Sequence, residues 1–326
     1  MNIFKQKGLT LVELMVSLVI GLIVTGVVMQ VFISNRQTFQ LQESMSRVQE
    51  SGRLGLQVLA DEIRHAGNGL MGVRTSVELC MLSTDRCDAY ATRALIGYVS
   101  TGAPNEVAGS DVLSIGRADG CNARVDGEYN AKSANFKATE YCPSMRQNGV
   151  LILTDLKRSV IFEVNNNPSK SPPVTINHAG PGNVVDNKLG GLDFEPGARV
   201  MGFSSQSFFV RETGSKDLAG NPLRTLAVRN DLASPPTVTD LLDGVEMMHV
   251  YYGVPTGGNM LYRRADAMPN ADWERVTAVR LELLMVADTA TRDADSQSVQ
   301  FGGADVTADG RFRQVYRTVV AIRGRI

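Results

Sequence analysis

The residue with the most evident chemistry is Glu13, a carboxylate at the start of a long apolar run. No charged residue occurs from Leu14 to Ser34, and at about 1.5 Å per residue a helix of this length crosses a hydrocarbon core of roughly 30 Å. An unpaired carboxylate in lipid costs about 2 to 3 kcal/mol or more, so an acid in this position indicates a functional site with a partner. Because the partner must balance a negative charge, we expect a cation.

The cysteines are the next candidates, because an even number of them in an oxidising compartment suggests disulfides. They lie in loop-like, polar sequence at Cys80, Cys87, Cys121 and Cys142. Four cysteines allow three pairings, and the sequence does not choose between them. Short loop closure favours Cys80 with Cys87 and Cys121 with Cys142.

No pattern in the sequence predicts catalysis. The histidines are His65, His178 and His249, and the chain has no GxSxG, HExxH, P-loop or nucleotide-binding glycine motif. We expect His65 at a helix end, facing backbone carbonyls or solvent. We therefore expect no enzymatic activity and no cofactor.

Calcium is a minor alternative in the aspartate-rich stretch 288–309, because oxygen-rich loops bind this ion. The EF-hand template fails there, since DADSQS lacks glycine at its sixth position and the twelfth position is Ala304. A solvated loop is the simpler prediction, with no metal.

Charge and composition exclude one class of partner. The chain has 326 residues, 43% of them hydrophobic, with 33 Lys and Arg against 34 Asp and Glu. A net charge of -1 gives no electrostatic basis for binding nucleic acid.

The residues before the apolar run set its orientation. Lys5 and Lys7 precede it without an acid among the first eight residues, so the N-terminus is expected in the cytoplasm and the chain beyond Arg36 outside. A secretory signal peptide fits poorly, because the run is too long and no small-x-small cleavage site follows it. On hydropathy alone, a plain single-span anchor remains the simplest alternative.

A single long helix is predicted from Leu9 to about Ala66, because no proline occurs there. This is about 58 residues, or roughly 87 Å. Apolar or small residues three and four apart mark one face of its second half: Leu41, Met45, Val48, Gly52, Gly55, Leu59 and Ile63. Glycines would leave holes in a coiled coil, so Gly52 and Gly55 predict close approach to a sheet. The helix is expected to end at residues 67–69, where glycine and asparagine provide C-caps.

Short alternating runs after Met71, separated by turn residues, predict an antiparallel β-rich head. The expected strands are 111–117, 149–154, 159–164, 199–203, 207–211, 224–229, 245–252, 276–286 and 314–323. Thr239–Asp243 (TDLLD) is interpreted as a short helical turn. The Pro-, Gly- and Asn-rich stretch 165–197 is expected to form surface loops.

The segment GLTLVEL, preceded by basic residues, resembles the class III leader of type IV prepilins. The resemblance implies that a prepilin peptidase cuts between Gly8 and Leu9 on the cytoplasmic side. Leu9, where this family usually has phenylalanine, would then be the first residue and a candidate for N-methylation. In this family the new terminal amine pairs with the glutamate of a neighbouring subunit, which assigns an assembly salt bridge to Glu13.

Later segments resemble the PilW family of minor pilins, in order: SGRLGLQVLADEIRHAG, GSDVLSIGRA, GVLILTDLKRSVIFEV, DLLDGVEMMHVYYGV and RTVVAIRGRI. The resemblance implies a protein that primes type IV pilus assembly at or near the pilus tip, supporting twitching motility and adhesion. Its implied partners are other minor pilins, the major pilin, a tip adhesin and the inner membrane. The head would be periplasmic before assembly and part of the pilus afterwards.

The expected fold is therefore α+β and type IV pilin-like. It has a leader (1–8), a transmembrane or fibre-core helix (9–35), the amphipathic half of that helix (36–66) and a β-rich head (67–326). Two alternatives are a J-type minor pseudopilin of type II secretion, and a signal-anchored periplasmic binding protein or enzyme.

Overall fold

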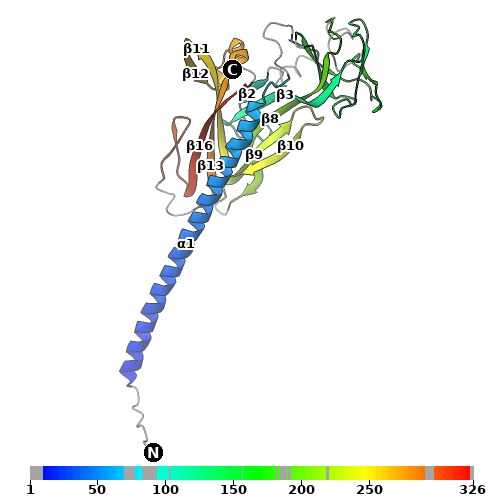
Figure 1. Cartoon of the computed structure of the whole chain (residues 1–326). Coiled ribbons are helices and arrows are strands. Elements are labelled where there is room, and N and C mark those ends of the chain that lie inside the picture. The colour runs from blue at the N-terminus through cyan, green and yellow to red at the C-terminus, as the bar shows by residue number, and fades with distance from the viewer. Residues whose placement is uncertain are drawn as a thin grey trace, which may run out of the picture.

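The computed structural model describes residues 10–69, 78–82, 94–102, 104–155, 157–180, 183, 189, 192–217, 220–290 and 297–323. One long helix, α1 (Leu11–Arg64), precedes a head made almost entirely of strands (Figure 1). The N-terminal half of α1 projects away from the head, and its second half lies along it (Figure 1). This is the predicted α+β, pilin-like architecture.

The helix ends close to where the sequence predicts. It spans 54 residues, and His65 is its C-cap, with the backbone N–H of His65 donating to carbonyls of the last turn. The ring Nδ1 of His65 lies 2.7 Å from the carbonyl oxygen of Asp61, in agreement with the expected position. Gly67 follows with a φ of 72°, a left-handed conformation that favours glycine. Its N–H donates to Gly116 O at 2.8 Å, so the chain leaves the helix beside a strand.

The larger sheet has eight strands in the order β1-β6-β5-β8-β3-β2, with β9 also paired to β8 and β10 paired to β9. Its pairs are antiparallel except β1 with β6. The strands are β1 (Glu78–Cys80), β2 (Leu95–Val99), β3 (Asp111–Arg124), β5 (Val150–Thr154), β6 (Ser159–Glu163), β8 (Arg199–Lys216), β9 (Pro222–Asn230) and β10 (Thr237–Asp243).

A four-stranded antiparallel sheet lies beside α1, in the order β12-β11-β13-β16. Its strands are β11 (Val245–Thr256), β12 (Asn259–Arg263), β13 (Ala278–Ala290) and β16 (Arg311–Ala321). Two two-stranded sheets and two short 3-10 helices complete the described elements: β4 (Asn135–Ala138) with β7 (Val174–Asn177), β14 (Val299–Phe301) with β15 (Ala304–Val306), η2 (Ala265–Ala267) and η3 (Asn270–Arg275).

Three sequence expectations are wrong in detail. Thr239–Asp243 is not a helical turn but part of β10, because it pairs with β9 and because Asp240 binds Arg211 of β8 through two hydrogen bonds of 2.6 Å. The strands expected at 199–203 and 207–211 are one continuous strand, β8. The expected loops 165–197 and 288–309 contain β7 and the β14–β15 pair, respectively.

The contact between α1 and the sheets is made where the sequence has glycine. A Cβ on Gly52 would overlap the ring of Tyr316 on β16. A Cβ on Gly55 would lie 2.9 Å from Leu242 Cδ2 on β10 and 3.1 Å from Leu283 Cδ1 on β13. Glycine therefore allows the helix backbone to contact both large sheets, where the sequence predicts close approach to a sheet.

Apolar burial in the turns after these glycines holds the helix in place. Leu59 and Ile63 are completely buried, and they belong to a core cluster that includes Val250 and Leu281 of the four-stranded sheet. Fully burying one such side chain contributes about 1.5 to 3 kcal/mol. A second core cluster lies among β4, β5, β6 and β7 and does not involve α1.

A buried ion pair also joins the two large sheets. Asp111 of β3 accepts hydrogen bonds from the Val250 backbone N–H at 2.7 Å and from Arg264 Nη2 at 2.5 Å. Burial raises the pKa of Asp111 from its usual value, while Arg264 opposes that effect. Removing one partner would leave a charge buried without compensation.

We predict that Gly52→Leu lowers the stability of the head by about 1 to 3 kcal/mol, because the new side chain displaces Tyr316. For a head of this size the melting temperature should fall by roughly 2 to 12 °C. Thermal unfolding of the detergent-extracted protein, followed by near-UV circular dichroism, measures this. Gly21→Leu is the matched control, since nothing lies within 4 Å of a Cβ there. Equal melting of the Gly52→Leu variant and the wild type would contradict the packing described.

Candidate functional site

At the start of the described chain, Thr10 and Glu13 form hydrogen bonds with each other. Thr10 is the N-cap of α1, and its Oγ1 accepts a hydrogen bond of 3.3 Å from the Glu13 N–H. In return, Glu13 Oε2 accepts from the Thr10 N–H and the Thr10 hydroxyl, each at 3.0 Å. This capping box is visible in the sequence as Thr-x-x-Glu, although sequence reasoning missed it.

The geometry leaves Glu13 able to bind a cation from another molecule. All its side-chain hydrogen bonds use Oε2, and among the described residues no Lys or Arg forms an ion pair with it. The other oxygen, Oε1, is therefore open to a positive partner. The predicted cleavage residues Gly8 and Leu9 lie outside the described residues.

The helix after Glu13 presents apolar side chains in every direction. Residues 11–40 are all exposed, and Leu11 and Phe32 retain 77% and 64% of their accessible surface. The Ser17 and Thr25 hydroxyls donate to carbonyls four residues earlier, each at 2.7 Å, which satisfies them without water. By length and composition the helix could cross a membrane. Such a surface requires lipid or other helices around it.

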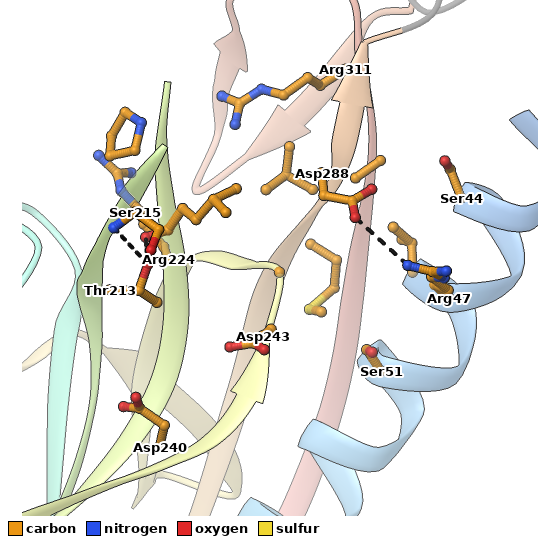
Figure 2. A pocket seen from close by; sticks show the side chains of 17 residues that line it. Ser44, Arg47, Ser51, Thr213, Ser215, Arg224, Asp240, Asp243, Asp288 and Arg311 are labelled. Carbon is orange, nitrogen blue, oxygen red and sulfur yellow. Dashed lines mark hydrogen bonds and ion pairs between the residues drawn. The ribbon is translucent and has the colours of Figure 1, made fainter. Parts of the chain in front are cut away.

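A groove opens where α1 meets the head (Figure 2). Its volume is about 520 Å³, and Figure 2 shows α1 forming one wall and strands of both large sheets forming the other. Arg47 on the helix lies 3.7 Å from Asp288 across it. The lining residues are Ser44, Arg47, Val48, Ser51, Thr213, Ser215, Pro222, Leu223, Arg224, Asp240, Asp243, Gly244, Met285, Val286, Ala287, Asp288 and Arg311.

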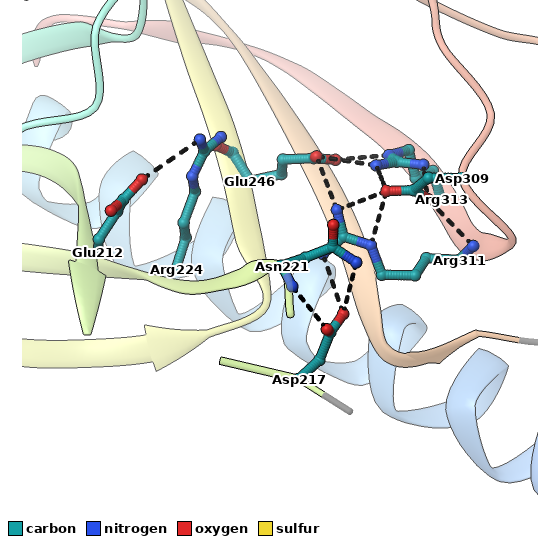
Figure 3. Close-up of polar contacts among 8 residues, drawn as sticks. All are labelled: Glu212, Asp217, Asn221, Arg224, Glu246, Asp309, Arg311 and Arg313. Atoms are coloured by element: carbon teal, nitrogen blue, oxygen red, sulfur yellow. Dashed lines mark hydrogen bonds and ion pairs between the residues drawn. The ribbon is translucent and has the colours of Figure 1, made fainter. Parts of the chain in front are cut away.

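A cluster of charged side chains includes Arg311, one of the residues that line the groove (Figure 3). Arg313 binds Glu246 through Nε at 2.6 Å and Nη2 at 2.9 Å, and its Nη1 binds Asp309 at 2.6 Å. Arg311 binds the same Asp309 through Nε at 2.9 Å and Nη2 at 2.7 Å. Both arginine side chains are almost fully buried. The cluster ties the start of β16 to β11.

The electrostatics of this cluster indicate a structural clamp. Burial by itself would raise the pKa of Asp309, but the hydrogen bonds from Arg313 and Arg311 outweigh it and hold the pKa well below the usual range. Asp309 is therefore charged at neutral pH, where it balances the two guanidinium groups. A carboxylate held in this state does not exchange protons near neutrality.

The histidines lie apart from the groove. Burial lowers the pKa of His178 to about 4, and burial together with the nearby Arg264 lowers the pKa of His249 to about 4. Both are neutral at pH 7 and surrounded by aromatic rings, Phe136 and Phe162 for His178 and Phe301 for His249. Within the described ranges, no three His, Cys, Asp or Glu residues are grouped to hold a metal ion.

The structure joins Cys121 of β3 to Cys142 in a disulfide, which is the neighbouring pair that short loop closure favoured. Their Cα atoms are 5.6 Å apart. Cys80 is also disulfide-bonded, and Cys87 lies outside the described residues. Disulfides persist in oxidising compartments such as the periplasm.

We predict that Asp309→Asn lowers the free energy of unfolding by about 2 kcal/mol at neutral pH, because two buried arginines lose a charged acceptor. A depressed folded-state pKa contributes stability above the unfolded pKa of about 4 and loses it as the pH falls further. The difference between wild type and variant should therefore be constant from pH 6 to 8 and shrink below about pH 4.

Urea unfolding across this pH range measures the effect, with Asp305→Asn as the control because Asp305 is exposed on β15 and forms no ion pair among the described residues. A difference that is absent at pH 7, or that grows in acid, would contradict the clamp.

Two family models match the chain. Residues 3–29 match the prokaryotic N-terminal methylation motif, and residues 208–324 match the type IV pilus-assembly protein W family, PilW. Searches of curated proteins and of solved structures found no match. The first match contains Gly8, Leu9 and Glu13, and the second contains the strands from β9 to β16. Together with the long apolar helix and the β-rich head, these matches support a PilW-like type IV pilin with a prepilin leader.

Proposed function

We propose that this minor pilin helps to prime type IV pilus assembly and lies at or near the pilus tip, where it supports pilus biogenesis, twitching motility and adhesion. The observation that carries the proposal is the unpartnered apolar half of α1, which begins at a carboxylate with one free oxygen. Such a helix would move from the bilayer into a bundle of similar helices with little change in its surroundings.

The proposed mechanism is assembly without catalysis by the chain itself. The prepilin peptidase would cut between Gly8 and Leu9, and N-methylation of Leu9 would follow. Glu13 Oε1 would then bind the terminal amine of a neighbouring subunit, while Oε2 keeps the Thr10 cap. In an apolar fibre core this charge pair is much stronger than on a surface, so it would fix the register of the subunits.

The size of the head supports a place at the tip. About 260 residues follow the helix, which is far larger than a repeating fibre unit usually carries. The match to the pilus-assembly family favours a pilus over the pseudopilus of type II secretion. The proposed partners are therefore the other minor pilins, the major pilin and a tip adhesin, with the head periplasmic before assembly.

We predict that Glu13→Ala leaves leader cleavage intact but reduces incorporation into pili at least about tenfold, because the subunit loses the group that sets its register. Immunoblots of sheared pili and of the membrane fraction, normalised to the processed protein, measure this. Glu43→Ala is the matched control, since Glu43 is exposed on the same helix and binds only Arg47 among the described residues. Full incorporation of the Glu13→Ala subunit would contradict the proposed salt bridge of Glu13 to a neighbouring subunit.

A further inference from the structure

β16 lies at the edge of the four-stranded sheet, and its register shows which of its backbone groups point away from that sheet. Among the described strands β16 pairs with β13 alone, in a register without shifts from Arg313 to Ala321. The Ile322 N–H donates to Thr277 O at 2.9 Å, which continues the ladder to β13. On the other side, the Arg313 N–H and C=O bind the Gln297 side chain at 2.9 and 2.6 Å. Because antiparallel backbone groups alternate in direction, odd-numbered residues here face away from β13.

Four outward-facing residues follow the one that Gln297 covers: Val315, Arg317, Val319 and Ala321. Within the described part of the chain, their backbone N–H and C=O groups have no partner. This stretch has no proline and no bulge, the usual means by which proteins protect an edge. The edge is therefore open to pairing with another strand.

The side chains on this edge lie on the sheet face opposite α1, since Tyr316, the even-numbered neighbour, packs under Gly52. Val319 is 57% exposed and lies opposite Arg280 of β13. Arg317 is half exposed; its Nε lies 3.2 Å from Glu282 Oε1 of β13, and its Nη2 donates to Gln300 O of β14 at 3.2 Å.

An added strand would place its own side chains beside these. The position opposite Val319 favours a β-branched or aromatic residue. Two residues away, the position opposite Arg317 favours an acid, because 52% of the Arg317 side chain stays exposed although Glu282 and the Gln300 carbonyl each bind one of its nitrogens. Ala321 leaves room for a large neighbour.

The described residues of this chain offer no edge strand with these two positions free. Among its described edge strands, β10 has the matching pattern, with Val238 two residues before Asp240. However, Asp240 is already bound by Arg211 through two hydrogen bonds of 2.6 Å. A different subunit is therefore the better partner than a second copy.

We propose that the Val315–Ala321 edge of β16 accepts an extended strand from the head of a different pilus subunit, with an acid of that strand beside Arg317 and an apolar residue beside Val319. This rests on the proposed function, because it requires a complex with other pilins. Main-chain hydrogen bonds would supply affinity and the two side-chain positions would supply selectivity.

Amide hydrogen exchange tests the proposal directly. The full chain is extracted in detergent from cells that make all subunits of the pilus, and from cells that make only this chain and the prepilin peptidase. In the complex, the amides of Val315, Arg317, Val319 and Ala321 should exchange at least about tenfold more slowly than in the chain alone, with little change in β12.

A backbone variant gives an independent test. Val319→Pro removes an outward N–H without removing a bond to β13, so the isolated chain should melt within a few degrees of the wild type. Recovery of the complex should fall at least about tenfold. Val319→Thr is the matched control, because it keeps the N–H and the branched shape, and its complex should be recovered at near wild-type yield. If Val319→Pro does not fold, the hydrogen-exchange comparison between the wild-type complex and the isolated chain tests the proposal by itself.

The outcomes separate the two proposals. A wild-type complex whose β16 edge exchanges as fast as in the isolated chain overturns the strand addition and leaves the proposed function standing. Protection that appears in the chain alone and grows with its concentration identifies a second copy and overturns the choice of partner. Absence of any complex with other pilins overturns the proposed function and the strand addition with it.

Discussion

The close packing of α1 across Gly52 and Gly55 is the contact on which the rest of the structure depends. One helix face contacts both large sheets here, through Tyr316 and Leu283 on one sheet and Leu242 on the other. Any larger residue would separate the helix from at least one sheet. The contact also fixes the direction in which the first half of α1 leaves the head, and therefore the position of Glu13.

This arrangement gives the two halves of the molecule different roles. The apolar side chains in the first half of α1 are exposed, because no described part of the head packs on them. Lipid or other helices must therefore cover them. The head is stabilised by its own cores and by the clamp around Asp309, so its groove and its β16 edge are held in a fixed position relative to the helix. In the proposed assembly, the helix supplies the common fibre contact and the head selects the neighbour.

Features with local causes were predicted from the sequence, whereas those that combine distant segments were not. The helix, its glycine contacts and its end follow from local patterns, as does the position of Glu13. The groove and the Asp309 clamp unite α1, β8, β9, β10, β11, β13 and β16, and no local pattern signals them. The segment Thr239–Asp243 was misinterpreted because pairing with β9 and the Arg211 contact override its local preference.

The central claim is that this chain is a processed fibre subunit, and intact mass tests it most directly. The membrane-extracted protein would be measured with and without the prepilin peptidase, at a precision that resolves one methyl group. We predict loss of residues 1–8 only when the peptidase is present, with Leu9 as the new and methylated N-terminus. An uncut chain under both conditions would contradict the account and leave a single-span anchor with a β-rich head.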